Sequence, residues 1–276
     1  MITRFAPSPT GLLHLGHAFS ALTAWARARA AGGQFLLRIE DIDTPRCRPA
    51  YEQAIYDDLH WLGLSWAEPA MRQSDRLPAY DAALAQLAAL GLTYPCSCTR
   101  ADLRAALSAP QEGHGPDGPI YPGPCRGRAM TSRRPGDAIR LDIARAMART
   151  GPIRFTETAA PRAGVHVIAP EDMRASVGDV VLARKDIGTS YHLAVVVDDA
   201  AQGITEVVRG EDLFAATSIH VLLQTLLGLP TPSYHHHRLI RDEAGKRLAK
   251  RDDARAIRHY RAAGLTPADT RALVGL

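Results

Sequence analysis

The sequence has few cysteines, few aromatic residues and no long hydrophobic run. Its longest apolar run, Leu193 to Val197, is far shorter than the roughly 20 residues that a membrane-spanning helix needs. Four cysteines in 276 residues are too few and too unevenly placed for a disulfide scaffold. Neither a glycine-rich Walker motif nor a dinucleotide signature occurs. We therefore expect a cytoplasmic protein with reduced thiols, and we exclude membrane proteins and disulfide-rich secreted domains.

What is present is the composition of a globular protein. Apolar residues make up 46% and charged residues 22%, which excludes disordered and fibrous chains. The length allows one large domain or two ordinary ones. The net charge is +4, and residues 241–276 hold nine Lys and Arg against five Asp and Glu, an excess equal to that of the whole chain. This basic end indicates contacts with phosphates.

The first part of the chain predicts alternating strands and helices. Ile2 to Ala6 is β-prone, Leu15 to Ala30 has helical spacing, and Phe35 to Ile39 reads as a second strand. A strand, a crossover helix and a strand form the unit of a parallel sheet. Because ligands of such sheets bind beyond the carboxyl ends of the strands, we expect chemistry at Glu40 and Asp41. Two amphipathic helices follow, over residues 48–62 and 78–90.

The middle of the chain has a different composition. Residues 94–136 are rich in Gly, Pro, Cys and Arg, which predicts a metal-stapled insertion. Short β-prone runs at residues 138–143, 153–156, 165–168 and 179–183 predict a small β-rich subdomain. Residues 191–202 fit a buried helix or a strand, 204–209 a strand, 211–227 a helix, and the segment from 252 onward is helical.

Two histidines, His14 and His17, lie three residues apart around Gly16, where the first predicted helix begins. At this spacing both rings share one face of the first turn, beside the free N–H groups of a helix N-terminus. Such a site can hold the phosphates of a nucleotide. An ordinary helix start with two exposed histidines is an equal alternative, because His-x-x-His is a weak pattern.

Three cysteines form a candidate zinc site: Cys96, Cys98 and Cys125. Structural zinc takes four ligands in a tetrahedron and prefers thiolates. Spacing alone leaves the fourth ligand open between His114 and Tyr121, and a chain that has lost the metal is the alternative. Cys47 lies apart from the group and has no assigned role.

The segment from Arg4 to His17, RFAPSPTGLLHLGH, resembles the HIGH-containing signature of class I aminoacyl-tRNA synthetases of the glutamyl branch. The similarity continues through GGQFLLRIEDIDTPR, QSDR at Gln73 to Arg76 and AVVVDDAAQGITEVVRGEDL, and it reaches about Arg255. It implies a doubly wound, Rossmann-like α/β catalytic domain with a parallel sheet and an inserted, zinc-containing, acceptor-binding-like subdomain. It also favours Tyr121 as the zinc ligand, because YPGPCR looks like the tyrosine-containing zinc site of the family.

The resemblance also implies site residues. His14, His17 and Lys250 would be catalytic and, with Gly16, would bind ATP accompanied by Mg²⁺. The residues that resemble the family's L-glutamate site are Arg4, Phe5, Ala6, Pro7, Ser8, Glu40, Tyr191 and Arg209. Arg4 or Arg209 would select a side-chain carboxylate through two parallel hydrogen bonds, and Glu40 would meet the ammonium. A structural ion pair is the alternative role for Arg209 and Glu40.

The second nucleotide element of the family, the KMSKS loop, corresponds to RLAKR at Arg247 to Arg251. Lys250 would neutralise the leaving pyrophosphate, although such a basic cluster is more often a solvated face. Two positions depart from the family: Ala249 replaces the usual serine, and Arg238 stands where the glutamyl branch generally has proline. His236 borders the adenine in one interpretation and lies on the surface in the other.

The resemblance divides the chain into residues 1–92 and 179–240 of the catalytic domain, the insertion 93–178, and a loop and helical end, 241–276, without an anticodon-binding domain. This architecture resembles stand-alone paralogues that activate glutamate and transfer it to the cyclopentene diol of queuosine in the anticodon loop of tRNA(Asp). The alternatives are a truncated synthetase that charges a tRNA 3′ end and a non-catalytic zinc and RNA-binding regulator. We expect a monomer with one structural zinc and no membrane partner.

Overall fold

The computed structural model describes residues 1–99, 101–102, 114–116, 118–241 and 256–276. Its strands are β1 (Ile2–Phe5), β2 (Gln34–Ile39), β3 (Met71–Arg72), β4 (Thr93–Cys96), β5 (His114–Gly115), β6 (Gly118–Pro119), β7 (Ala138–Leu141), β8 (Ile153–Glu157), β9 (Gly164–Ile168), β10 (Val181–Ala183), β11 (Glu206–Gly210) and β12 (Ser233–His237). Its α-helices are α1 (Leu15–Ala30), α2 (Pro49–Trp61), α3 (Leu77–Ala89), α5 (Ile143–Thr150), α6 (Pro170–Ser176), α7 (Tyr191–Ala201), α8 (Thr217–Leu227), α9 (Ile257–Ala262) and α10 (Pro267–Leu273). Short 3₁₀ turns are η1 (Thr44–Arg46), η2 (Gln73–Arg76), η3 (Met130–Ser132) and η4 (Glu211–Leu213).

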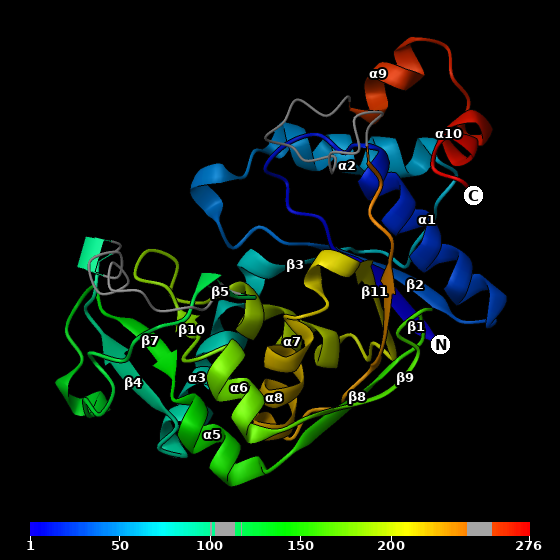
Figure 1. Cartoon of the computed structure of the whole chain (residues 1–276). Helices are drawn as coiled ribbons and strands as arrows, with labels where there is room; N and C mark the ends of the chain where they lie inside the picture. The colour runs from blue at the N-terminus through cyan, green and yellow to red at the C-terminus, as the bar shows by residue number, and fades with distance from the viewer. Residues whose placement is uncertain (100, 103–113, 117, 242–255) are drawn as a thin grey trace.

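The strands of the catalytic region run mostly parallel. β1 pairs in parallel with β2, and β2 with β3. The backbone N–H of Thr205 donates to the carbonyl oxygen of Ile2 at 3.0 Å, so β11 begins beside β1. β11, β12 and β8 are also parallel, and β9 is an antiparallel edge strand. The expected parallel sheet and its β1–α1–β2 crossover unit are confirmed (Figure 1).

Both faces of this sheet are covered, because successive side chains of a strand point to opposite faces. Phe5 packs in one apolar cluster with side chains of α1 and α2, and Thr3 donates to the carbonyl oxygen of Ala24 in α1 at 2.8 Å. Arg4 points to the other face, toward α7. A larger apolar cluster there joins α3, α7 and α8. The arrangement is the expected double winding.

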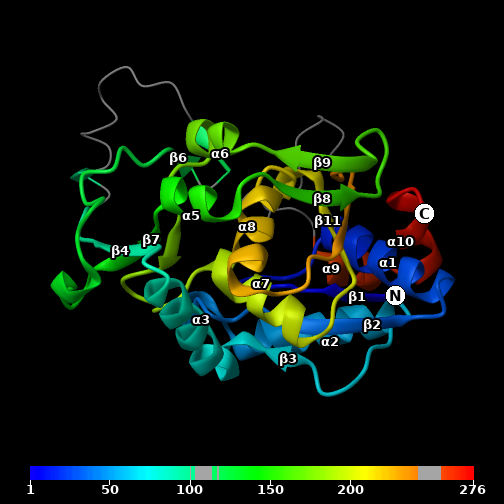
Figure 2. The same ribbon diagram turned by 90° about the horizontal axis from the view of Figure 1, so that it is seen from below.

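The inserted region forms its own antiparallel sheet in the order β10–β7–β4, with the β5–β6 hairpin beside it. Figures 1 and 2 place this sheet at one end of the molecule and both chain termini at the other. The β-prone runs that were expected in one β-rich subdomain divide between two sheets. β7 and β10 belong to the insertion, whereas β8 and β9 extend the sheet of β11 and β12.

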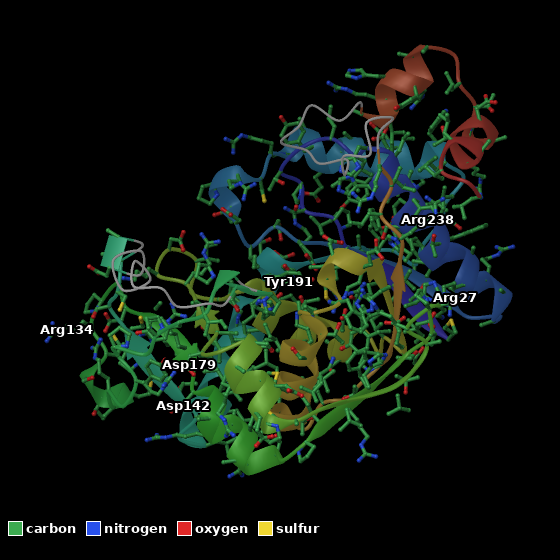
Figure 3. The ribbon with its side chains drawn as sticks, in the orientation of Figure 1. Arg27, Arg134, Asp142, Asp179, Tyr191 and Arg238 are labelled. Carbon is green, nitrogen blue, oxygen red and sulfur yellow. The ribbon has the colours of Figure 1, made fainter. Side chains whose placement is uncertain are left out.

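A buried carboxylate, Asp179, joins the parts of the insertion. It accepts hydrogen bonds from the hydroxyl of Tyr94, from Nε of Arg126 at 2.8 Å and from the backbone N–H of Ile143 at 3.0 Å. Figure 3 shows Asp179 near Asp142 in this region, across the molecule from Arg27 and Arg238. One side chain therefore fixes β4, the 126 loop and the start of α5 together.

Most predicted helices occur within one or two residues of their expected bounds. The segment 191–202, which fits a helix or a strand, is the helix α7. The predicted helix 211–227 is wrong in its first part, which forms η4 before α8 begins at Thr217. There the carbonyl oxygen of Leu213 accepts hydrogen bonds from Arg209 and Thr217 side chains. Among the described residues, none of the helices is long and apolar enough to cross a membrane.

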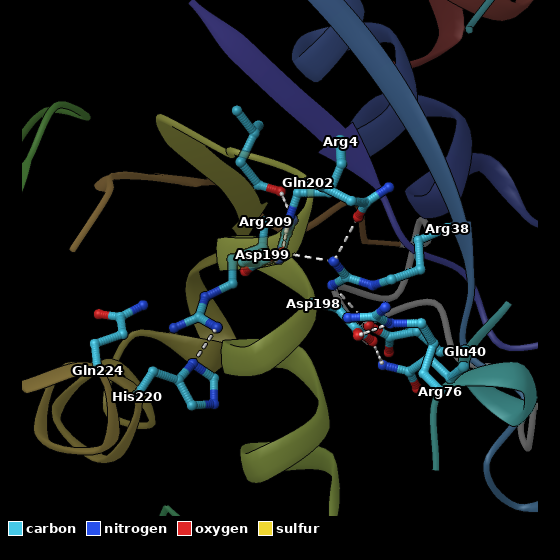
Figure 4. Close-up of polar contacts among 12 residues, drawn as sticks. Arg4, Arg38, Glu40, Arg76, Asp198, Asp199, Gln202, Arg209, His220 and Gln224 are labelled. Carbon is cyan, nitrogen blue, oxygen red and sulfur yellow. Dashed lines mark hydrogen bonds and ion pairs between the residues drawn. The ribbon is translucent and has the colours of Figure 1, made fainter. Parts of the chain in front are cut away.

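Two adjacent carboxylates of α7 connect the sheet with the helices behind it. Asp198 accepts from Gln73, Arg76 and Tyr80 at 3.0, 3.1 and 2.6 Å. Asp199 accepts from Nε of Arg4 at 2.9 Å and from Nη1 of Arg38 at 2.6 Å (Figure 4). Arg38 is fully buried, and a buried guanidinium is stable only when it is paired.

Replacing Asp199 with alanine should therefore destabilise the fold strongly. The change leaves the buried Arg38 without its main counter-charge, and breaking such a pair costs about 3–5 kcal/mol of unfolding free energy. Urea unfolding followed by circular dichroism measures this loss. Asp186→Ala is the control, because its pair with Arg184 is exposed and should contribute less than about 1 kcal/mol. Equal losses in the two variants would contradict this account of the core.

Candidate active site

A pocket with a volume of about 380 Å³ lies at the carboxyl ends of four parallel strands, β2, β1, β11 and β12. This edge is where ligands of open α/β sheets bind. The loops after β1 and β2 are held together by the backbone N–H of Glu40, which donates to the carbonyl oxygen of Pro7 at 3.0 Å. Apart from Lys250, every residue expected to bind glutamate or ATP lines this pocket: Arg4, Phe5, Ala6, Pro7, Ser8, His14, Gly16, His17, Glu40, Tyr191 and Arg209.

The two histidines of the first helix cap its N-terminus. Nδ1 of His14 accepts from the backbone N–H of Gly16 at 3.1 Å, and Nδ1 of His17 accepts from the backbone N–H of His14 at 3.1 Å. In a neutral ring that accepts at Nδ1, the proton lies on Nε2, so both rings present Nε2 as a donor. A Cβ atom at Gly16 would lie 3.0 Å from the His14 ring, so glycine leaves the space that the ring occupies.

The back wall of the pocket carries a buried ion network. Asp199 binds Nε and Nη2 of Arg4, and Arg38 bridges Asp199 and Glu40. Burial raises the pKa of Glu40 despite the attraction of Arg38 and Arg4. Burial also opposes ionisation of Asp199, but Arg4 and Arg38 outweigh it and lower the pKa of that carboxyl. The carboxylate-binding fork of Arg4 is thus occupied by the protein.

Arg209, at the end of β11, is held differently. Its Nε donates to Nε2 of His236 at 3.0 Å, and Nη1 donates to Nδ1 of His220 at 2.9 Å. Nη2 donates to Thr217 at 2.8 Å and to the carbonyl oxygen of Leu213 at 3.2 Å. Within the described part of the chain, these contacts occupy four of the five N–H groups of the guanidinium.

Two neighbouring histidines of β12, His236 and His237, lie in different surroundings. His236 does not line the pocket. It lies behind Arg209, where its Nδ1 contacts the Glu157 carboxylate. The expectation that His236 borders the adenine is therefore wrong, and the alternative of a surface position is wrong as well, because the ring is buried. His237 lines the pocket instead.

The basic loop expected to complete the nucleotide site lies outside the described residues, and with it Lys250, Ala249 and the rest of Arg247 to Arg251. The described residues on both sides of it are at the pocket. Ile240 lines the wall, and Ala256 forms a β-bridge with His14.

Arg238, at the family's proline position, also lines the pocket. Its guanidinium lies over the Phe19 ring at 4.7 Å, and its Nη2 donates to the carbonyl oxygen of Val274. The side chain that replaces proline therefore ties the C-terminal helix α10 to the pocket wall.

Several functional neighbours were not found from the sequence. These residues hold the pocket side chains in place, but the sequence analysis gave none of them a role: Asp199, Arg38, His220 and Glu157. Asp199 had a partial signal, since a pair of carboxylates ends the apolar stretch of α7. Asp41, expected near the chemistry beside Glu40, instead accepts from the backbone N–H and hydroxyl of Ser74 at 2.8 and 2.7 Å.

The thiols of three cysteines lie together in the insertion, with all sulfurs within 4.8 Å of one another: Cys96, Cys98 and Cys125. Cys98 and Cys125 are 3.6 Å apart, close to the about 3.8 Å that Zn–S bonds of about 2.3 Å give in a tetrahedron. The Tyr121 hydroxyl lies 3.4 and 3.5 Å from the sulfurs of Cys96 and Cys98. Tyr121, one of the two candidates for a fourth ligand, therefore adjoins this group, whereas the side chain of the other candidate, His114, is outside the described part of the structure.

Comparison with known proteins agrees with this geometry. The family model of class I tRNA synthetases (E and Q), catalytic domain, matches residues 1–276. The chain is 61% identical to the glutamyl-Q tRNA(Asp) synthetase of Rhodobacter capsulatus over the whole of both chains. It is 45% identical to the Nocardia farcinica protein of the same name, over 98% of this chain and 82% of the other.

Among solved structures, glutamate-tRNA synthetase from Elizabethkingia anophelis superimposes with a TM-score of 0.73 at 29% identity. The match covers 91% of this chain and 53% of the other, so the chain spans about half the length of that protein. The family match, the similar proteins and the pocket geometry all lead to the same conclusion about the family. The chain is a ligase and belongs to the class I tRNA synthetases of the E and Q type.

Proposed function

We propose that this enzyme activates L-glutamate with ATP and transfers the glutamyl group to the cyclopentene diol of queuosine in the anticodon loop of tRNA(Asp). The observation that carries the glutamate part is the charge of the pocket wall. The charged residues that line the pocket are three arginines and two carboxylates: Arg4, Arg209, Arg238, Glu40 and Asp212. The buried Arg38 pairs with Asp199 behind them. The names of relatives that match over nearly the whole chain support queuosine in tRNA(Asp) as the acceptor of the glutamyl group.

The excess positive charge suits glutamate better than glutamine. Glutamate carries two carboxylates and one ammonium, whereas glutamine is neutral overall. Glu40, which also pairs with Arg38, lines the pocket and would meet the ammonium, and Arg209 lines it as the cation for the side-chain carboxylate. Because four of its N–H groups are occupied, Arg209 offers charge and one hydrogen bond rather than a two-bond fork.

The activation step needs ATP, which brings its own Mg²⁺, at the start of α1. The α-carboxylate oxygen of glutamate attacks the α-phosphorus, the bond to the β-phosphate oxygen breaks, and pyrophosphate leaves. The Nε2 donors of His14 and His17 and the N-terminal end of α1 would stabilise the charge that develops there. Lys250 would neutralise the departing pyrophosphate.

In the transfer step, a hydroxyl of the cyclopentene ring attacks the acyl carbon of glutamyl-adenylate. The new ester bond forms as AMP leaves, and the hydroxyl proton is released. Because the acyl group is already activated, correct positioning can suffice without a strong base, and we assign none. We propose that residues 93–178 contact the RNA, that the basic residues 241–276 contact phosphate groups, and that the reaction takes place in the cytoplasm.

We also propose one structural zinc in the insertion. The donor set fits, since three thiols and one phenol surround a common point with spacings suited to tetrahedral coordination: Cys96, Cys98, Cys125 and Tyr121. When bound, the ion would join β4 to the 121–125 loop.

Labelled glutamate tests the whole proposal. The enzyme is incubated with ATP, labelled glutamate and tRNA(Asp) that contains or lacks queuosine, and the label is mapped to a nucleotide. We expect the label at queuosine only. Periodate cleaves the cyclopentene diol, so tRNA treated with periodate should no longer accept the label. Label on the terminal ribose would instead identify a synthetase that charges the 3′ end, and absence of glutamate-dependent ATP–pyrophosphate exchange would exclude both enzymes.

The metal proposal predicts about one zinc per chain by elemental analysis. Cys125→Ser should remove most of the bound zinc and lower the melting temperature, because structural zinc contributes directly to folding. Cys47→Ser is the matched control, since Cys47 lies outside the cluster, and it should retain the metal. A wild-type protein without zinc, or equal loss in both variants, would refute the proposal.

A further inference from the structure

We propose that His220 and His236 are positioning residues that hold the Arg209 guanidinium without neutralising it, and that this neutral support selects a carboxylate substrate. The inference rests on the proposed glutamate activation and extends it to residues that do not touch the substrate. Figure 4 shows the contact between Arg209 and His220, with the ion network of Arg4 and Arg38 on the other side of α7.

Hydrogen-bond chemistry fixes the protonation of both rings. A guanidinium has donors and no acceptor, so each imidazole nitrogen that it contacts must carry a lone pair. Nδ1 of His220 and Nε2 of His236 are therefore unprotonated, at 2.9 and 3.0 Å from Arg209 nitrogens. The remaining protons point outward, from Nε2 of His220 to His192 at 3.1 Å and from Nδ1 of His236 to Glu157.

Burial and charge favour the same neutral state. Burial, together with the neighbouring Arg209 cation, holds the pKa of His220 well below its usual value. The same two causes lower the pKa of His236 to about 4, although Glu157 opposes the shift. Both rings remain neutral acceptors at neutral pH.

Arg209 and Arg4 differ in whether their partners are charged. Arg4 and Arg38 are paired with Asp199, and Arg38 also with Glu40, so two carboxylates compensate the two guanidinium charges inside the protein. Among the residues that the structure describes, Arg209 forms no ion pair. Its partners are two imidazoles, a hydroxyl and a carbonyl. The guanidinium is thus fixed in place while its charge stays available to a ligand in the pocket.

Glutamate and glutamine side chains at position 220 provide a matched test, because they differ in charge and hardly in shape. Both can accept from Arg209, but only the carboxylate in H220E neutralises it. We expect the KM for glutamate in ATP–pyrophosphate exchange to be about 30-fold higher in H220E than in H220Q. The KM for ATP should differ little between the two. Discrimination against glutamine, measured as a ratio of kcat/KM values, should fall in H220E alone.

A second pair of variants, at Thr217, changes the charge beside a different nitrogen of Arg209. It keeps the test valid if a variant at position 220 misfolds. Thr217 accepts from Nη2 at 2.8 Å and is the first residue of α8, where an aspartate is compatible with the helix dipole. T217D should raise the KM for glutamate relative to T217N in the same direction. Equal glutamate KM values within both pairs would overturn the inference. Failure of the wild-type enzyme in the exchange assay would instead overturn the proposed function.

Discussion

The site depends on how two carboxylates, Asp199 and Glu40, compensate the two buried arginines of the back wall of the pocket, Arg4 and Arg38. Arg4 and Arg38 come from neighbouring strands, at positions that point to the same face of the sheet, and Asp199 meets both from α7. Without this carboxylate the wall would hold several unpaired cations, which a protein interior does not tolerate. With it, Arg209 is the buried cation at the pocket that forms no ion pair with a described residue, which is the basis of the preference for an anionic ligand that we propose.

The architecture explains why these groups meet. In a parallel sheet every strand ends at the same edge, so residues from positions 4 to 8, 40, 209 and 237 reach one pocket although they are far apart in sequence. The helix α1 then starts at that edge, and its N-terminus brings the two capping histidines to the same space. The proposed binding of an amino acid and of phosphates in adjacent positions would therefore follow from the topology.

Local pattern in the sequence was sufficient for α1, β2 and the position of Glu40 at the end of a strand, whereas His14 and His17 were assigned to the pocket only through the resemblance to a family. It was not sufficient for the supports behind them. The pairing of Arg38 with Asp199 joins residues separated by 161 positions, and no spacing rule connects them. The three histidines of β12 illustrate the same limit. Alternation along a strand implies that His236 and His237 face opposite sides, but only the packed structure shows that His237 faces the pocket and His236 the arginine behind it.

The central claim is that Arg209 keeps its charge for the ligand, and a crystal structure with a non-hydrolysable glutamyl-adenylate analogue tests it most directly. The account predicts the side-chain carboxylate of the ligand beside Arg209, with its ammonium at Glu40 and both imidazoles still accepting from the guanidinium. A complex in which a protein carboxylate pairs with Arg209, or in which the ligand carboxylate lies away from it, would contradict the account.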